Sequence, residues 1–232
     1  MSRQAKVIPS YHEHRKRLKQ RFDKSSFKGF HDYEVLELLL TFVIPREDTK
    51  PAAKELIEKF KHLPGVLSAE MDELQQVNGI GPQAARFLKI LDAFIAFYFD
   101  QKALLGAIQF TRLPELVDYF KATIGQSPNE VMRVVYLNSQ NKLIAAENLT
   151  EGTVSQAVAF PRKIVEGALK HHATSVIIAH NHPGGLPQPS DNDNSITQQI
   201  KDALYTVNIT LQEHIIVAED GFYSYRQGGI LD

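Results

Sequence analysis

Two histidines, His180 and His182, end an apolar run and open the stretch HNHPGGLPQPSDND. If the run is a β-strand, side chains two residues apart point to the same face, so both imidazoles can bind one metal ion. Asp193 follows His182 by eleven residues, in the first turn of a helix that Ser190 is expected to cap. Two imidazoles and a carboxylate leave the fourth position of a tetrahedral zinc ion open, which is typical of catalytic rather than structural zinc.

The same residues also allow an interpretation without a metal. Ser190 and Asp193 have a spacing like that of a capping box, which begins a helix through hydrogen bonds alone. Two nearby histidines are common on protein surfaces, and short motifs of this kind carry a real risk of false positives. The spacing by itself therefore leaves both interpretations open.

The composition restricts the kind of metal site and the class of protein. The chain has 232 residues with ordinary globular composition, nine histidines and no cysteine. Any metal must therefore be held by imidazole and carboxylate groups. No apolar run approaches the length needed to cross a bilayer, and the first residues lack the apolar segment of a signal peptide. We therefore expect a cytoplasmic protein.

The charge is unevenly distributed along the chain. The net charge of −1 argues against nucleic acid as a partner of the whole protein. The first 25 residues, however, carry only two acidic side chains against eight basic ones, Arg3, Lys6, Arg15, Lys16, Arg17, Lys19, Arg21 and Lys24. Such a patch can bind phosphates, but a solvated, partly disordered tail and first helix is the commoner explanation.

Residues 1–105 are expected to form an all-helical domain. The apolar positions of HDYEVLELLLTFVI indicate a buried helix that ends before Pro45, because a residue before proline disfavours the α conformation. DTKPAAKELIEKF has Asp48 or Thr49 as N-cap and a proline in its opening turn. SAEMDELQQV and PQAARFLKILDAFIAFYF predict two further helices.

Residues 106–232 change to a mixed pattern. LPELVDYFKATI, PRKIVEGALKH and SITQQIKDALYTV are helical, whereas VMRVVYL, KLIAAENL, TSVIIAH and EHIIVAE are strand-like. This alternation predicts an α/β or α+β domain. The boundary lies inside or just after a long helix, so the sequence indicates no flexible linker.

The metal motif and its surroundings resemble a known family. His180-x-His182-Pro183 followed by Ser190-x-x-Asp193 resembles the JAMM motif of MPN-fold metalloproteases. FPRKIVEGALKHHATSVIIAHNHPGG and EHIIVAEDGFYSY are similar to the bacterial RadC branch of that fold, and HRKRLKQRF, DYEVLELLL and VNGIGPQAA resemble its helical domain. The resemblance implies an N-terminal helix-hairpin-helix domain, then a mixed-sheet MPN (JAB/JAMM, cytidine-deaminase-like) domain with flanking helices and one zinc ion per chain.

The resemblance also implies a catalytic glutamate at the start of the first core strand. By order along the chain this position falls on Glu130, in NEVMRVVYL. A carboxylate near a metal-activated water can take its proton and later deliver it to a leaving amine. Ser190 is expected to help hold the tetrahedral oxyanion. Glu147 and Glu151, in or after the second strand, are competing positions for the base.

Two positions depart from the usual pattern of the family. Gly184 stands where serine is common, and Glu213, directly before His214, stands where aspartate is common. Neither position is a zinc ligand in the motif, so the expected metal site is unaffected. Glu213 and His214 are expected either to orient a ligand or to lie at a solvated strand start.

VNGIGP, between two apolar helices, resembles a helix-hairpin-helix turn. Gly79 and Gly81 permit a tight turn whose backbone N–H groups can approach a DNA phosphate without sequence preference. The hairpin itself contains no basic residue, and degenerate copies of the motif serve as packing units. DNA contact therefore stays open.

Two functions follow from these patterns. The first is a zinc metallopeptidase of the JAMM type that cleaves a peptide or isopeptide bond in a protein or peptide substrate. The second is a DNA-associated accessory protein, of the repair or recombination type, with a structural or vestigial metal domain. The intact ligand set and the available glutamate favour the metallopeptidase, because a vestigial site is expected to lose a ligand.

Overall fold

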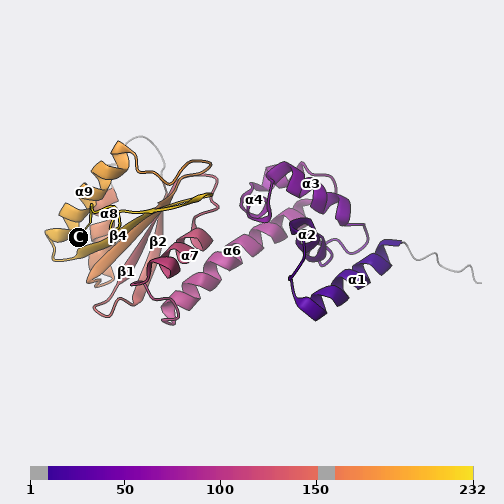
Figure 1. Cartoon of the computed structure of the whole chain (residues 1–232), viewed down its shortest axis with the longest axis horizontal. Helices are drawn as coiled ribbons and strands as arrows, with labels where there is room; N and C mark the ends of the chain where they lie inside the picture. Colours follow the sequence, from indigo (N-terminus) through magenta and orange to yellow (C-terminus); the bar gives the residue numbers. More distant parts are fainter. Residues whose placement is uncertain (1–9, 151–159, 232) are drawn as a thin grey trace, which may run out of the picture. The chain divides into compact units, whose positions relative to one another are not determined.

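The computed structural model describes residues 10–150 and 160–231, and the chain divides into two compact units, Met1–Asp92 and Ala93–Asp232 (Figure 1). The described part of the first unit is helical, as predicted. Leu36, Leu56 and Leu88 are fully buried in its core. Its helices are α1 (Ser10–Ser25), α2 (Asp32–Leu40), α3 (Lys50–Phe60), α4 (Leu63–Ser68), α5 (Met71–Gln75) and the start of α6 (Pro82–Leu104).

Two details of this helical unit differ from the sequence prediction. The predicted helix before Pro45 ends at Leu40, several residues short of the proline. The amides that follow form 3₁₀-type hydrogen bonds to the carbonyl three residues back, such as Phe42 N to Leu39 O (3.2 Å). The short helix α4 was not predicted. The His62 side chain caps it by accepting a hydrogen bond from the Gly65 amide (2.9 Å).

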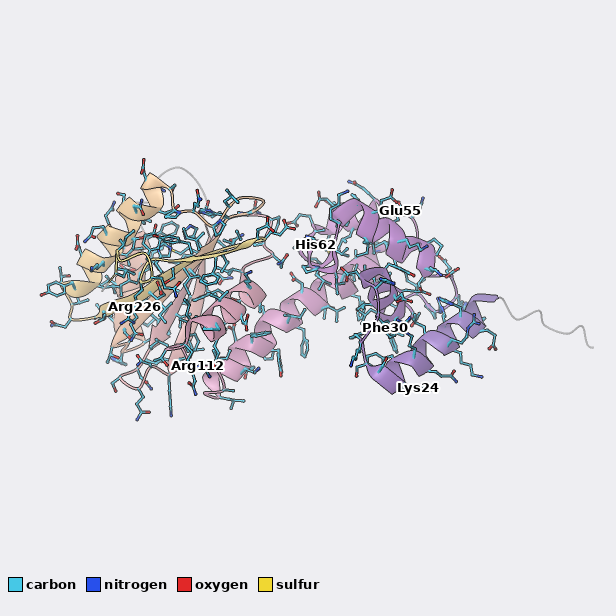
Figure 2. All side chains as sticks on the ribbon, in the orientation of Figure 1. Lys24, Phe30, Glu55, His62, Arg112 and Arg226 are labelled. Carbon is cyan, nitrogen blue, oxygen red and sulfur yellow. The ribbon has the colours of Figure 1, made fainter. Side chains whose placement is uncertain are left out.

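The basic first helix is only partly a solvated surface. Arg15 is buried, and its guanidinium donates hydrogen bonds to the carbonyl oxygens of Ile44 (2.7 Å), Pro45 (2.8 Å) and Glu47. Lys24, in the last turn of the same helix, is exposed (Figure 2). The expected helix is therefore present, but one of its basic residues, Arg15, stabilises the segment that follows α2 through hydrogen bonds. Arg3 and Lys6 lie outside the described residues.

The second unit is a mixed α+β domain, which confirms the predicted fold class. Its five-stranded sheet has the order β2-β1-β3-β4-β5, with β3 and β4 parallel and the other neighbours antiparallel. The strands are β1 (Val131–Leu137), β2 (Leu143–Thr150), β3 (Ser175–Asn181), β4 (Thr210–Ala218) and β5 (Gly221–Ser224). The helices are α7 (Leu113–Thr123), α8 (Phe160–Lys170) and α9 (Asp191–Tyr205).

Helices cover both faces of the sheet (Figure 1). On one face, Val134 and Ile178 of the strands form a core with α8 and α9. On the other, Val135, Ile177 and Ile215 form a core with α7 and the end of α6. Because successive strand residues point to opposite faces, each strand supplies both cores in alternation.

The long helix α6 begins in the first unit and ends in the second. Its second half is held by Arg133 of β1, whose Nη2 lies 2.6 and 2.8 Å from the two carboxylate oxygens of Asp100 and donates to Tyr119 Oη at 3.1 Å. The predicted domain boundary at residue 105 falls at the end of this helix, whereas the compact units meet inside it. The difference arises because Ala103 already packs in the core of the second unit.

No helix among the described residues is both long enough and apolar enough to cross a membrane.

Candidate metal centre

Four side chains converge where β3 ends and α9 begins. His180 is the second-last residue of β3 and pairs with Met132 of β1. Glu130, the residue just before β1, therefore lies beside it. His180 Nε2 is 3.0 Å from His182 Nε2, 3.2 Å from Asp193 Oδ1 and 3.8 Å from Glu130 Oε1. One ligand atom from each of the four side chains lies within 4.8 Å of all the others, so the group could hold a metal ion.

The residue between the two histidines, Asn181, positions the loop that carries Glu130. Its side chain is fully buried and points to the opposite face of β3 from its neighbours. Its Oδ1 accepts from the Val131 amide (2.8 Å), and its Nδ2 donates to the carbonyls of Ser127 (3.0 Å) and Asn129 (3.1 Å). This role was not predicted from the sequence, although strand alternation at HNH already places Asn181 on the face opposite the two histidines.

The loop after β3 fixes the second imidazole. His182 Nδ1 lies 2.9 Å from the carbonyl oxygen of Leu186. Gly184 has φ +63°, a conformation that favours glycine and lets the loop turn back toward α9. Because a carbonyl only accepts, the contact requires a proton on Nδ1, which leaves the Nε2 of a neutral His182 as a lone pair.

This arrangement fits a cation. The Nε2 lone pair of His182 faces His180 Nε2, and Asp193 Oδ2 lies 3.6 Å from the same atom. Two nitrogens bound to one tetrahedral zinc ion are roughly 3.3 Å apart, close to the observed spacing of the two rings. A hollow of about 30 Å³ beside Glu130, His180 and Asp193 has room for an ion or a water molecule.

Asp193 is at once a helix cap and a member of the cluster. The Ser190 amide (2.8 Å) and hydroxyl (2.7 Å) both donate to Asp193 Oδ2, and the Asp193 amide donates to Ser190 Oγ (3.1 Å). This is the capping box expected from the sequence, and it leaves Oδ1 facing His180. Burial by itself raises the pKa of the Asp193 carboxyl, but the neighbouring His180 imidazole and the hydrogen bonds from Ser190 outweigh it and hold the pKa well below its usual range.

Of the other carboxylates considered for the base, Glu147 lies elsewhere. Its Oε1 is 3.0 Å from Nε2 of His171, the residue just after α8. Glu147 is on β2 and pairs with Val134 of β1, whereas His180 pairs with Met132, two residues earlier on β1. Glu151 lies outside the described residues.

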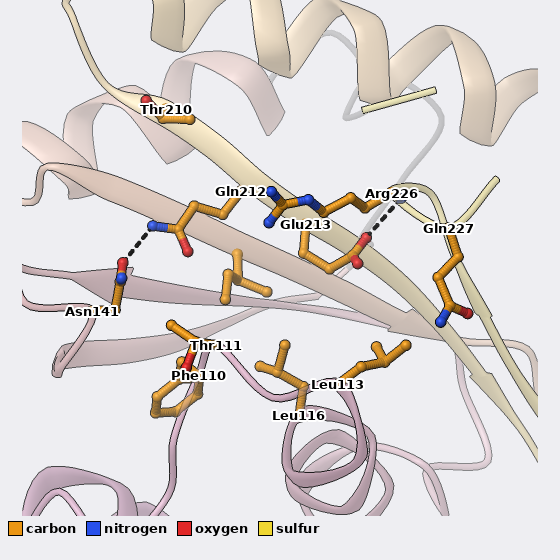
Figure 3. Close-up of a pocket in the computed structure, with 11 residues that line it drawn as sticks. Phe110, Thr111, Leu113, Leu116, Asn141, Thr210, Gln212, Glu213, Arg226 and Gln227 are labelled. Carbon is orange, nitrogen blue, oxygen red and sulfur yellow. Dashed lines mark hydrogen bonds between the residues drawn. The ribbon is translucent and has the colours of Figure 1, made fainter. Parts of the chain in front are cut away.

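Glu213 and His214, adjacent on β4, point to opposite faces of the sheet. The Glu213 carboxylate lines a cavity of about 440 Å³ (Figure 3). It accepts from the Ser224 hydroxyl (2.6 Å) and the Arg226 amide (3.1 Å), which ties β4 to the end of β5. His214 is fully buried on the other face, with its Nε2 at 2.8 Å from His180 Nδ1, and burial lowers its pKa well below the ordinary value. Neither residue is at a solvated strand start.

The glycines considered for DNA contact lie in the first unit. Gly79 and Gly81 are exposed in the turn between α5 and α6, and Gly79 adopts φ +82°. The buried Ile80 between them anchors the turn to the helical core. A tight glycine turn is therefore present, and its contact with DNA stays a prediction.

Comparison with known proteins identifies the family. The model of the RadC-like JAB domain matches residues 110–230. A UPF0758 protein of Fusobacterium nucleatum is 36% identical over 224 residues, which cover 94% of this chain and 97% of the relative. A UPF0758 protein of Ruegeria pomeroyi is 36% identical over 225 residues, or 97% of this chain and 100% of the relative.

The fold and the comparisons define a protein with a helical N-terminal unit and a JAB domain. The chain belongs to the RadC family.

Proposed function

We propose that this protein is a zinc-dependent hydrolase of the JAMM type, which cleaves a peptide or isopeptide bond. The observation that carries the proposal is the convergence of two imidazoles and two carboxylates within 4.8 Å at the end of β3. Membership of a JAB-domain family supports the same chemistry. The substrate is a protein or peptide, because the reaction needs a carbonyl carbon bonded to a leaving amine.

His180, His182 and Asp193 are the proposed ligands, and Glu130 is the proposed base. A zinc ion held by the three ligands would polarise a carbonyl and lower the pKa of a water molecule to about 7. The exposure of the side chains supports this division of roles, since 47% of Glu130 is accessible to solvent against 2% of His180. A base must exchange protons with substrate and solvent, whereas ligands are better held rigidly.

Glu130 moves the protons of the proposed reaction. Its carboxylate takes a proton from the water that attacks the scissile carbonyl and gives it to the nitrogen of the leaving amine as the C–N bond breaks. The bonds that Asn181 makes to the loop before β1 keep Glu130 close to the cluster. Ser190 keeps its proposed role beside the oxyanion, although its hydroxyl points at Asp193 in this structure and must turn to donate to substrate.

The metal is tested by elemental analysis of the purified protein. We expect about one zinc ion per chain, and none in the double variant His180→Ala, His182→Ala, because two of three ligands are lost. Asp193→Asn should weaken zinc binding, since an amide is a poorer ligand than a carboxylate. Full zinc content in the double variant overturns the proposed site.

The hydrolysis is tested with Glu130→Gln, which should keep the fold and the zinc. Cell lysate is treated with the zinc-loaded wild type or with the variant, and newly formed amino groups on proteins are labelled and identified. We expect new amines with the zinc-loaded wild type, and their formation should be slower by about a hundred- to ten-thousand-fold with the variant. If the zinc-loaded wild type releases no amines, the protein is not a hydrolase of these bonds. Equal rates for both proteins mean that Glu130 is not the base.

A further inference from the structure

A series of hydrogen bonds between buried groups leads away from the metal centre, beginning at His180. His180 Nδ1 is 2.8 Å from His214 Nε2, and His214 Nδ1 is 2.6 Å from Thr197 Oγ1. Thr197 Oγ1 in turn lies 2.5 Å from the backbone carbonyl oxygen of Asp193. The series therefore begins at one proposed ligand and ends on the backbone of another, and all of its members are buried.

The contact between Thr197 and Asp193 determines which atom is the donor in each of these hydrogen bonds. A carbonyl oxygen only accepts, so the single hydroxyl proton of Thr197 is donated to Asp193 O. Thr197 Oγ1 is then an acceptor, and the proton between it and His214 belongs to His214 Nδ1. The Nε2 of a neutral His214 is in consequence a lone pair, which accepts from His180 Nδ1–H. The only nitrogen of His180 without a proton is Nε2, the atom that faces His182, Asp193 and Glu130.

We propose that His214 and Thr197 are positioning residues that hold the His180 proton on Nδ1, so that Nε2 is always available to the metal. The inference rests on the proposed zinc site and adds to it a device that selects the tautomer of one ligand. The backbone of Asp193 is the fixed point of this device, because α9 holds it rigid. The same hydrogen bonds thereby link two proposed ligands on different elements, His180 of β3 and Asp193 of α9.

The packing around His214 keeps the series aligned. Its ring stacks on Tyr225 with centroids 4.5 Å apart and planes within 8°, so the imidazole cannot rotate freely. Tyr225 is itself fixed by its hydroxyl, which donates to Asn194 Oδ1 of α9 (3.1 Å). An apolar side chain could fill the same volume at no cost of polar burial, so the use of an imidazole at this fully buried position is explained by its hydrogen bonds.

The first test reads the tautomer directly in the metal-free wild type. Nitrogen NMR of the protein labelled at histidine distinguishes a ring nitrogen that carries a proton from one that does not. We expect His180 to carry its proton on Nδ1 at a pH where the ring is neutral. A proton on Nε2 overturns the inference without any variant.

The second test measures zinc affinity by competition with a chelator in four variants of the full chain, one of them a control. Loss of an oriented outer partner of a ligand typically costs about 10- to 100-fold in metal affinity, so His214→Phe and Thr197→Val should show a loss in this range. His214→Gln should retain most of the affinity, because its amide oxygen can accept in place of Nε2. His171→Gln, just after α8, is the matched control and should bind zinc as tightly as the wild type, because His171 contacts Glu147 and not the metal centre.

The outcomes separate this inference from the proposed function. If the wild type binds no zinc, the proposed function fails and the inference fails with it. If the wild type binds zinc and the folded His214→Phe and Thr197→Val variants bind it equally well, only the inference is overturned. Should His214→Phe fail to fold, Thr197→Val and the tautomer of the wild type decide the question.

Discussion

Replacement of Ser190 by alanine separates the structural role of this residue from its proposed role in catalysis. The substitution removes the oxygen that accepts from the Asp193 amide at the start of α9 and the hydroxyl that donates to Asp193 Oδ2. Loss of such a cap costs about 1 kcal/mol of stability. For a unit of this size the expected decrease in Tm is roughly 3 °C.

The Ser190→Ala substitution also affects the carboxylate of Asp193, not only the stability of α9. With one of the two Ser190 hydrogen bonds gone, Oδ2 is held only by the backbone amide, so the proposed ligand is less well oriented. We expect the zinc affinity to fall by about tenfold or more, as for other outer partners of metal ligands. Thermal unfolding of the metal-free protein and chelator competition measure the two effects independently.

Ser195→Ala is the matched control for this experiment. It makes the same substitution inside α9, at an exposed position whose hydroxyl accepts from Gln199 (3.1 Å). It should leave Tm and zinc affinity almost unchanged. If Ser190→Ala also leaves both unchanged and slows hydrolysis alone, Ser190 acts on the substrate, and the assignment of its hydroxyl to Asp193 is refuted.

Four further substitutions test other parts of the structure. Glu147→Gln should change neither zinc content nor hydrolysis, both measured against the wild type, because this carboxylate pairs with His171. Gly79→Ala should lower the thermal stability of the first unit by about 1 kcal/mol, since φ is +82°, whereas Gly81→Ala, with open space around its Cβ, should not. Glu37 of α2 is buried, and burial raises the pKa of its carboxyl in the folded protein, so the folded state binds this proton more tightly than the unfolded state. Denaturant unfolding should therefore show stability that falls as pH rises through the raised pKa. Glu37→Gln should flatten that dependence, and an unchanged slope contradicts the reasoning.

Most of the secondary structure could be predicted because its signals are local. Helical periodicity predicted the helical first unit, and β-branched runs predicted β1 to β4 of the second. The prediction was least accurate where one side-chain contact decides the outcome. The cap that His62 places on α4 and the tight turn after Leu40 depend on individual hydrogen bonds that residue patterns do not encode.

The first helix gives a second example of this limit. Its basic composition predicted a helix in solvent, and the structure shows Arg15 bonded to three carbonyls after α2. The composition of a segment shows that a charge is present but not which group binds it. The carbonyls that accept from Arg15 belong to a turn far along the chain. Buried charges of this kind are visible only once the helices have packed.

The sequence by itself determined which side chains can serve a metal: no cysteine, two histidines on one strand face, and an aspartate in the first turn of the next helix. These are relations within one short segment, and strand and helix geometry is enough to derive them. For the catalytic glutamate, the family resemblance pointed to Glu130 but left Glu147 and Glu151 as competitors, and the tertiary structure brings Glu130 to the cluster. Only the tertiary structure decided that Asn181 holds the loop before β1 and that Thr197 and His214 bond in series to His180. Those contacts depend on the strand order β1-β3-β4 and on the packing of α9 against it, and no spacing along the chain specifies which strands become neighbours.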